Sequence, residues 1–115
     1  MKSLGDEARV RILNLLIVAN ELTITDLELI LDFTQTKTSR HVTYLKNSGL
    51  LSARKHDQWV IYGIKEEWKD VIKQIVGYFE KDVTLIKDVE VYNTLESNRE
   101  LFSGKIKTKW AGLEG

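Results

Sequence analysis

Seven of the side chains between residues 35 and 46 offer hydrogen-bonding groups or positive charge around a narrow apolar stripe: Gln35, Thr36, Lys37, Ser39, Arg40, Thr43 and Lys46. An arginine can donate two hydrogen bonds to the O6 and N7 atoms of guanine, and a glutamine can pair with adenine. Hydroxyl groups and lysines suit the phosphates of a nucleic-acid backbone. The chemistry that these residue types indicate is recognition of double-stranded DNA.

The same residues lie on a predicted helix over residues 34–47. Thr34 can cap its N-terminus, and Gly49 is well placed to end it in a left-handed conformation. Val42 and Leu45 belong to a narrow apolar stripe, so most of the circumference stays polar. An ordinary amphipathic helix would show the same pattern, which by itself therefore does not decide the function.

Positive charge is concentrated in the same part of the chain. The formal net charge is zero, but residues 1–33 carry −3, residues 34–65 carry +5 and residues 66–115 carry −2. A basic middle between acidic flanks localises the positive potential that a phosphate backbone would meet. A charge run is often only a solvated face, but here it coincides with the polar helix.

Catalytic and metal-binding residues are scarce. The chain has no cysteine, which excludes disulfides, thiolate metal sites and cysteine nucleophiles. Ser39 and His41 lie two positions apart, so their side chains would not face each other on a helix. The sequence has no glycine-rich phosphate loop and no histidine cluster. We therefore expect no enzyme, no cofactor and no metal.

The length of 115 residues suits one domain with a modest core. No apolar run approaches the roughly 18–20 residues of a membrane span. The segment Met1–Asp6 lacks the apolar core of a signal peptide. We expect a cytoplasmic protein.

Further elements can be predicted on both sides of the polar helix. A largely buried helix is expected over residues 6–19, and a capping-box pattern at Thr25 and Glu28 predicts a second helix over residues 25–31. Residues 50–64 form two β-prone runs around a polar tip, which indicates a hairpin carrying Arg54 and Lys55. A long helical pattern follows from Lys65 to about Tyr92, with a break expected near Gly77 or Lys81. Beyond Leu95 we expect one short helix and a frayed end.

The long helical pattern carries more apolar surface than a compact three-helix core needs. Burial against a second copy of the chain would account for it, and packing within one chain is the alternative. The predicted dimer interface consists of apolar residues three and four positions apart: Trp68, Val71, Ile72, Ile75, Phe79, Val83 and Ile86.

The order of helix, helix, polar helix, hairpin and long helix is that of a winged helix-turn-helix. The residues also resemble the arsenical-resistance-repressor (ArsR) family of bacterial regulators, over about residues 4–92. The resemblance rests on the segments Leu4–Leu13, Gln35–Val42 and Leu45–Leu51 and on the hairpin Arg54–Tyr62.

The resemblance implies a mainly α fold with a small β-hairpin wing, dimerising through the long C-terminal helix. Residues 1–96 would form the DNA-binding and dimerisation domain, and residues 97–115 a tail. Gln35, Thr36, Ser39 and Arg40 match the positions that contact bases and phosphates in the family. Lys37, Thr43 and Lys46 would contact the backbone, and Arg54 and Lys55 the flanking groove. A homodimer on a near-palindromic operator and repression relieved by a signal are also implied.

The sequence departs from the family at its metal sites. Thr23 and Thr25 stand where many members carry two cysteines that bind arsenic or soft metals, and hydroxyls do not replace thiolates there. No histidine follows His56, so the zinc site on the last helix is missing as well. Asp82, Asp88 and Glu90 suggest a solvated acidic face, with a hard-cation site as the less favoured alternative.

A second departure concerns the N-terminus. Many members have an additional helix before the segment that corresponds to Leu4–Asp6, and it helps them to dimerise. We therefore expect this dimer to rely on the long C-terminal helix and on Trp110.

Three classes of function fit the sequence to different degrees. A DNA-binding repressor fits the polar helix, the basic middle segment and the resemblance. A winged helix used for protein–protein contact is the main alternative, but the face from Gln35 to Lys46 lacks large apolar anchors. An enzyme is the least favoured class. His41 falls beside the apolar stripe, and we expect it to be structural.

Overall fold

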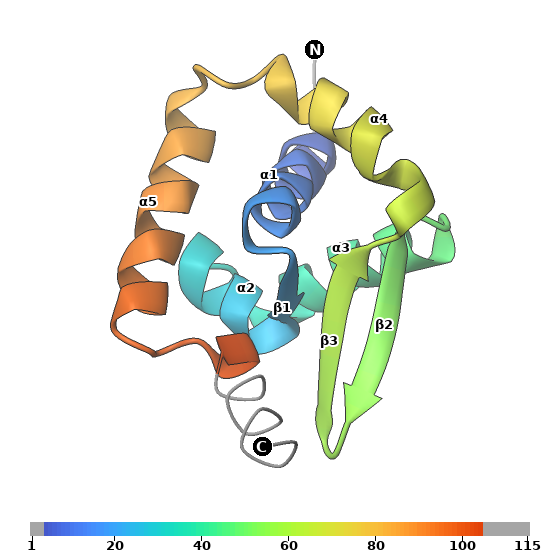
Figure 1. The fold of residues 1–115 in the computed structure, drawn as a ribbon, viewed down its shortest axis with the longest axis vertical. Helices are drawn as coiled ribbons and strands as arrows, with labels where there is room; N and C mark the ends of the chain where they lie inside the picture. The colour runs from blue at the N-terminus through green and yellow to red at the C-terminus, as the bar shows by residue number, and fades with distance from the viewer. Residues whose placement is uncertain (1–3, 105–115) are drawn as a thin grey trace.

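The computed structural model describes residues 4–104. The elements follow the order α1 (Leu4–Ala19), β1 (Glu21–Thr23), α2 (Ile24–Leu31), α3 (Gln35–Asn47), β2 (Leu51–His56), β3 (Trp59–Ile64), α4 (Glu66–Gly77) and α5 (Val83–Ser97). In Figure 1, α1 lies in the centre, with α5 on one side, α4 on the other and the β2–β3 hairpin projecting away from them. The mainly α fold with a β-hairpin wing is confirmed.

Hydrogen bonds at its two ends fix α3. The Thr34 side chain accepts a hydrogen bond from the Lys37 amide at 3.1 Å, as the sequence predicted. At the other end Gly49 adopts a φ of 85°, and the Leu50 amide donates to the Leu45 carbonyl at 3.1 Å. This closure leaves the last carbonyls satisfied, because only the left-handed residue lets the chain turn back on the helix end. Local sequence therefore sets the length of α3.

The start of α2 differs from the prediction. The capping box is formed by Thr23 and Asp26 rather than by Thr25 and Glu28, so the helix begins at Ile24. The Asp26 amide donates to the Thr23 hydroxyl at 3.1 Å, and the Thr23 amide donates to the Asp26 carboxylate at 3.1 Å. The sequence contains both capping-box patterns, Thr23 with Asp26 and Thr25 with Glu28. The first of them forms because Thr23 is also the last residue of a strand.

That strand, β1, was not predicted. It pairs antiparallel with β3 and brings Leu22 opposite Tyr62, so the sheet has the order β1-β3-β2 instead of being a lone hairpin. The predicted hairpin is confirmed as β2 and β3, joined through Asp57 and Gln58, with Asp57 at a φ of 55°. An additional strand anchors the base of the wing to the helical core.

The long helical pattern is divided in two, near the expected break. α4 ends at Gly77, and Asp82 caps α5 by accepting hydrogen bonds from the Thr84 and Leu85 amides at 2.9 and 3.1 Å. The turn between them lets both helices pack against α1. None of the helices within residues 4–104 is long and apolar enough to cross a bilayer.

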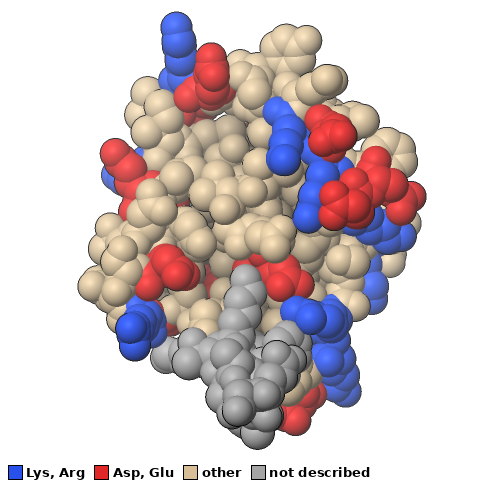
Figure 2. Space-filling view, in the orientation of Figure 1, with Lys and Arg blue, Asp and Glu red and all other residues tan. Residues whose placement is uncertain are grey.

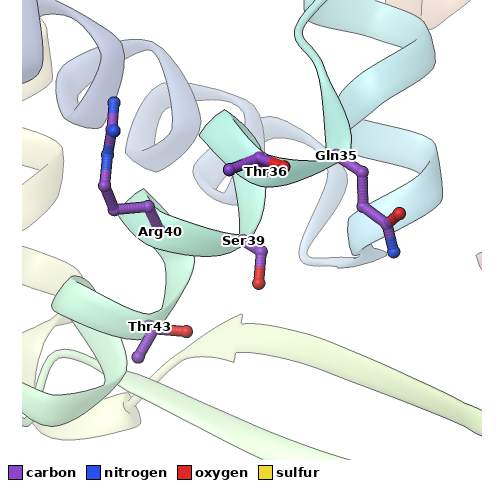
Figure 3. A pocket seen from close by; sticks show the side chains of 5 residues that line it. All are labelled: Gln35, Thr36, Ser39, Arg40 and Thr43. Carbon is purple, nitrogen blue, oxygen red and sulfur yellow. The ribbon is translucent and has the colours of Figure 1, made fainter.

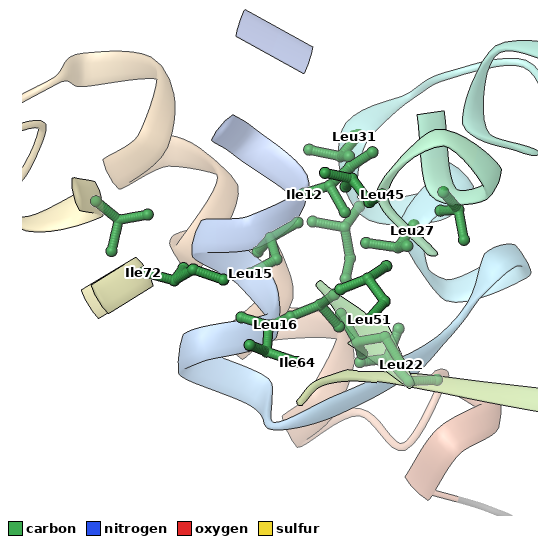
Figure 4. Close-up of a cluster of buried hydrophobic side chains, with 14 residues drawn as sticks. Ile12, Leu15, Leu16, Leu22, Leu27, Leu31, Leu45, Leu51, Ile64 and Ile72 are labelled. Atoms are coloured by element: carbon green, nitrogen blue, oxygen red, sulfur yellow. The ribbon is translucent and has the colours of Figure 1, made fainter. Parts of the chain in front are cut away.

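The hydrophobic core lies where the helices meet the base of the sheet. Figure 4 shows side chains from α1, α2, α3, α4 and the strands converging there, with Ile12, Leu15 and Leu27 fully buried. Ile72 from α4 and Leu101 from beyond α5 belong to the same cluster. The core therefore packs against one face of α3 and leaves the opposite face of this helix uncovered.

The segment after α5 returns to the start of α2. A single helical turn begins at Phe102, and its Phe102 and Ser103 amides donate to the buried Asp26 carboxylate at 2.6 and 3.0 Å. The Phe102 ring also packs on Trp59 of β3, with ring centroids 4.6 Å apart. The predicted short helix is thus present, whereas Trp110 lies outside the described residues.

Candidate nucleic-acid interface

Five polar residues of α3 line one open groove on the protein surface. The groove has a volume of about 480 Å³ and is lined by Gln35, Thr36, Ser39, Arg40 and Thr43. In Figure 3, the Arg40 side chain extends toward α1, and Gln35 points in the opposite direction. The structure therefore brings together the four residues that were predicted to contact bases and phosphates and adds Thr43, which was predicted as a backbone contact.

The opposite face of α3 is buried. Thr38, His41, Val42 and Leu45 are the buried residues of this helix. The Thr38 hydroxyl, fully buried, donates to the Thr34 carbonyl at 2.8 Å, so its polar group is satisfied within the helix. Burial of one face and hydration of the other fix which side chains a partner can reach.

His41 lies between the core and the charged surface and is 5% exposed. Burial lowers the pKa of His41, and the positive charges of Arg40, Arg9 and Lys37 lower it further. The imidazole is therefore neutral at pH 7. His41 is buried as expected, while Ser39 faces the groove.

Two predicted backbone contacts, Lys37 and Lys46, lie on α3 outside the residues that line the groove. The Lys37 ammonium stands 4.0 Å from the centre of the Phe33 ring, which holds it at the first turn of the helix. Lys46 is exposed in the last turn. The first turn contains no acidic residue, so nothing there opposes an approaching phosphate.

The wing carries Arg54 and Lys55 on β2, both exposed. In Figure 2 basic side chains gather at the lower right, over the wing, and acidic side chains gather above them, on the same side as α4. Arg54 is paired with Glu21 of β1, with a guanidinium nitrogen 3.1 Å from the carboxylate. This pairing was not predicted, because β1 itself was missed.

The residues at the family's metal positions have other roles here. Thr23 caps α2, and Asp82 caps α5. The expected solvated acidic face was wrong for Asp88, which is 3% exposed and paired with Arg11 of α1. Within residues 4–104, no three histidine or acidic side chains are grouped closely enough to hold a metal ion.

Most of the predicted dimer interface forms an exposed apolar surface on α4 and α5. Trp68, Val71, Ile75 and Ile86 are 40–45% exposed, and Val83 is 78% exposed. The exposures of Ile72 and Tyr78 differ from the predicted dimer interface. Ile72 is only 2% exposed and belongs to the core of its own chain, so it is not available to a partner, whereas Tyr78, which was not predicted, is 88% exposed.

The sequence pattern of the bacterial regulatory proteins of the arsR family matches residues 6–53. The arsenical resistance operon repressor of Escherichia coli is 48% identical over 61 residues, which is 53% of this chain and 52% of the relative. An arsenic resistance transcriptional regulator of Pseudomonas putida is 39% identical over 66 residues, 57% of each chain.

A solved structure shows a similar fold over most of its length. HlyU from Vibrio cholerae superimposes with a TM-score of 0.58 and 32% identity, covering 64% of this chain and 79% of HlyU. Residues 6–53 form the helix-turn-helix domain of the ArsR family of bacterial regulatory proteins. The fold of the chain is the winged helix-turn-helix, in which α2 and α3 form the helix-turn-helix and β2 and β3 form the wing.

The matching region of the ArsR family contains α1, α2, α3 and the start of β2, which is the part that presents the groove. The matched segment spans 52% and 57% of the length of the two curated relatives, little more than half. Because the family pattern ends at residue 53, α4 and α5 lie beyond the part of the chain that it describes.

Proposed function

We propose that this protein is a transcriptional regulator that binds double-stranded DNA through α3 and the wing. The observation that carries the proposal is the groove on α3, where Gln35, Ser39 and Arg40 stand together on the uncovered face of a helix. An α-helix fits the major groove of B-DNA, and these residue types can bond to base edges and phosphates. The family relationship supports the same assignment.

The roles within the interface follow from position. Arg40 and Gln35 would contact bases, and Thr36, Ser39 and Thr43 would contact bases or phosphates within the groove. Lys37 and Lys46, at the two ends of α3, would contact the phosphate backbone. Lys55, and Arg54 while paired with Glu21, would approach DNA flanking the major-groove site. This arrangement gives α3 the specificity and the wing a share of the affinity.

We also propose that the protein acts as a homodimer. Of the exposed apolar residues, Trp68, Val71 and Ile75 lie on α4, and Val83 and Ile86 lie on α5. Large apolar side chains that stay exposed in such number are often covered by a partner, and a two-fold axis is the commonest arrangement of two identical chains. Two copies of α3 would then enter successive major grooves of a near-palindromic operator.

Repression is the proposed direction of regulation, since the Escherichia coli relative is named as the repressor of an operon. A regulator of bacterial promoters would act in the cytoplasm. The proposal for the direction is tested with a reporter driven by the promoter of the gene itself. Deletion of the gene should raise expression, whereas a fall would indicate an activator.

DNA binding is tested by fluorescence anisotropy with the duplex upstream of the protein's own gene and a scrambled duplex of the same composition. Binding should favour the native duplex, at two chains per site, and should weaken steeply as salt increases. Equal binding to both duplexes would indicate a non-specific DNA binder. Failure to bind either duplex at low salt would refute the proposal and favour a winged helix that contacts proteins.

A further inference from the structure

Tyr44 is an aromatic residue at an exposed position on the polar face of α3. Its side chain is 54% exposed, and it lies one turn after Arg40 on the same side of the helix. The guanidinium carbon of Arg9, on α1, stands 4.2 Å from the centre of the Tyr44 ring. Neither residue was among the DNA contacts predicted from the sequence, and Arg9 lies in the acidic first third of the chain.

Stacking on the ring orders the Arg9 guanidinium. The guanidinium is planar, and contact with an aromatic face restricts its orientation. Its N–H groups can then donate to a phosphate from a fixed direction. The Tyr44 hydroxyl is a second group of a type that commonly bonds to phosphate oxygens. The two side chains therefore present a pair of donor groups at the edge of α3 nearest α1.

Arg9 lies close enough to α3 for its charge to act on the same residue as those of Arg40 and Lys37. The positive charges of Arg40, Arg9 and Lys37 all lower the pKa of the buried His41, after the larger effect of burial. Three cationic side chains from two helices thus lower the pKa of the same residue of α3. Arg40 lies one turn before Tyr44 on the same side of α3, and Tyr44 carries the Arg9 guanidinium over its ring.

We propose that Arg9 and Tyr44 bind one phosphate of the DNA backbone beside the site that α3 contacts, so that α1 is part of the DNA interface. This inference rests on the proposed DNA-binding function and extends it to a second helix. The ligand is a backbone phosphate, so the contact adds affinity without distinguishing sequences. Arg9 and Tyr44 also fix the orientation of α1 on the duplex.

The test is the salt dependence of DNA binding for Arg9→Gln and Tyr44→Leu. Arg9→Gln removes a charge that neutralises a phosphate, so it should reduce the slope of log affinity against log salt by about 0.9 per subunit, which corresponds to a roughly eightfold loss of affinity at 0.1 M salt. Tyr44→Leu keeps the charge of Arg9, so it should lower the affinity while its slope stays near that of the wild type. The loss should be equal for the native and the scrambled duplex. The double variant should bind about as well as Arg9→Gln alone, because the two residues act as a unit.

Two further variants separate this role from a structural one. Arg99→Gln removes the same charge at an exposed position after α5 and should leave the slope unchanged. Arg9→Lys keeps the charge but loses the planar stack, so its slope should stay near that of the wild type while its affinity falls. The thermal midpoint of each variant, measured alongside, shows whether the fold is intact.

The outcomes are distinguishable. If the wild type binds neither duplex, both the proposed function and this inference are overturned. If the wild type binds and Arg9→Gln has the slope of Arg99→Gln, the function stands and the phosphate contact is refuted. If Arg9→Gln does not fold, an unchanged slope and affinity for Arg9→Lys and Tyr44→Leu would refute it equally.

Discussion

The guanidinium of Arg11 on α1 donates two hydrogen bonds to the carboxylate of Asp88 on α5, each 2.9 Å long. The side chains are 19% and 5% exposed, so the pair is largely shielded from water. Bonding to Asp88 raises the pKa of Arg11 above its ordinary value, and the guanidinium stays charged across the physiological range. The Arg11 guanidinium carbon also stands 5.1 Å from the centre of the Phe33 ring, in the turn before α3.

Breaking this pair from one side should strongly destabilise the protein. Asp88→Asn or Arg11→Met leaves the remaining charge without its partner in a shielded site, at a cost of about 3 kcal/mol. The double variant Arg11→Met with Asp88→Asn should be less destabilised than the sum of the two single changes, because no unpaired charge remains. Urea unfolding at fixed protein concentration measures these free energies, and strictly additive losses would argue against a direct interaction.

A second long-range contact predicts a local effect at the C-terminal end of the described chain. The Asp26 carboxylate accepts hydrogen bonds from the amides of Thr23, Phe102 and Ser103. Asp26→Asn keeps the shape but replaces one acceptor oxygen by a donor, which should cost about 3 kcal/mol. Amide hydrogen exchange at Phe102 and Ser103 should also accelerate. Asp32→Asn is a matched control at an exposed left-handed position and should change stability by less than about 0.5 kcal/mol.

Local signals predicted α3 well, whereas contacts between distant segments remained hidden. The Thr34 cap and Gly49 act within a few residues, so the sequence pattern contains the information needed to place them. Strand β1 has three residues, too few for a detectable alternation, and forms only because β3 lies beside it. The choice between the two capping boxes at the start of α2 depends on that pairing.

The candidate site shows the same division. Its residues on α3 were predicted because polar groups surround a narrow apolar stripe. The partners that hold or extend the site come from elsewhere in the chain, as Glu21 does for Arg54 and Arg9 does for Tyr44. Asp88 lies 77 residues from Arg11 in the sequence. The residues adjacent to Asp88 in the chain do not indicate whether its carboxylate is paired and buried or exposed to solvent.

The proposed dimer predicts a change of oligomeric state when its apolar surface is charged. Ile75→Lys places an ammonium group on α4 at a position that is 45% exposed in the single chain. The monomer should tolerate this change, but a dimer would have to bury the charge without a partner. Sedimentation velocity should therefore show a monomer, and DNA binding should weaken. Leu29→Lys on α2, at a position that is 49% exposed, is the matched control and should remain dimeric. Identical sedimentation of the two variants would contradict the proposed interface.

Arg40 and Lys46 should contribute to DNA binding in different ways, because one lines the groove and the other lies in the last turn of α3. Arg40→Ala should cost about 1–3 kcal/mol of binding free energy and relax the sequence preference at one position of each half-site, since it removes a base contact. Lys46→Ala should weaken binding to all duplexes about equally and lower the salt slope by about 1, since it removes a phosphate contact. Competition against a set of single-base operator variants, repeated at two salt concentrations, measures both quantities for each protein. If Arg40→Ala weakens all duplexes equally and shifts the salt slope as Lys46→Ala does, then Arg40 contacts the backbone, and sequence preference must come from Gln35 and the hydroxyl groups of the groove.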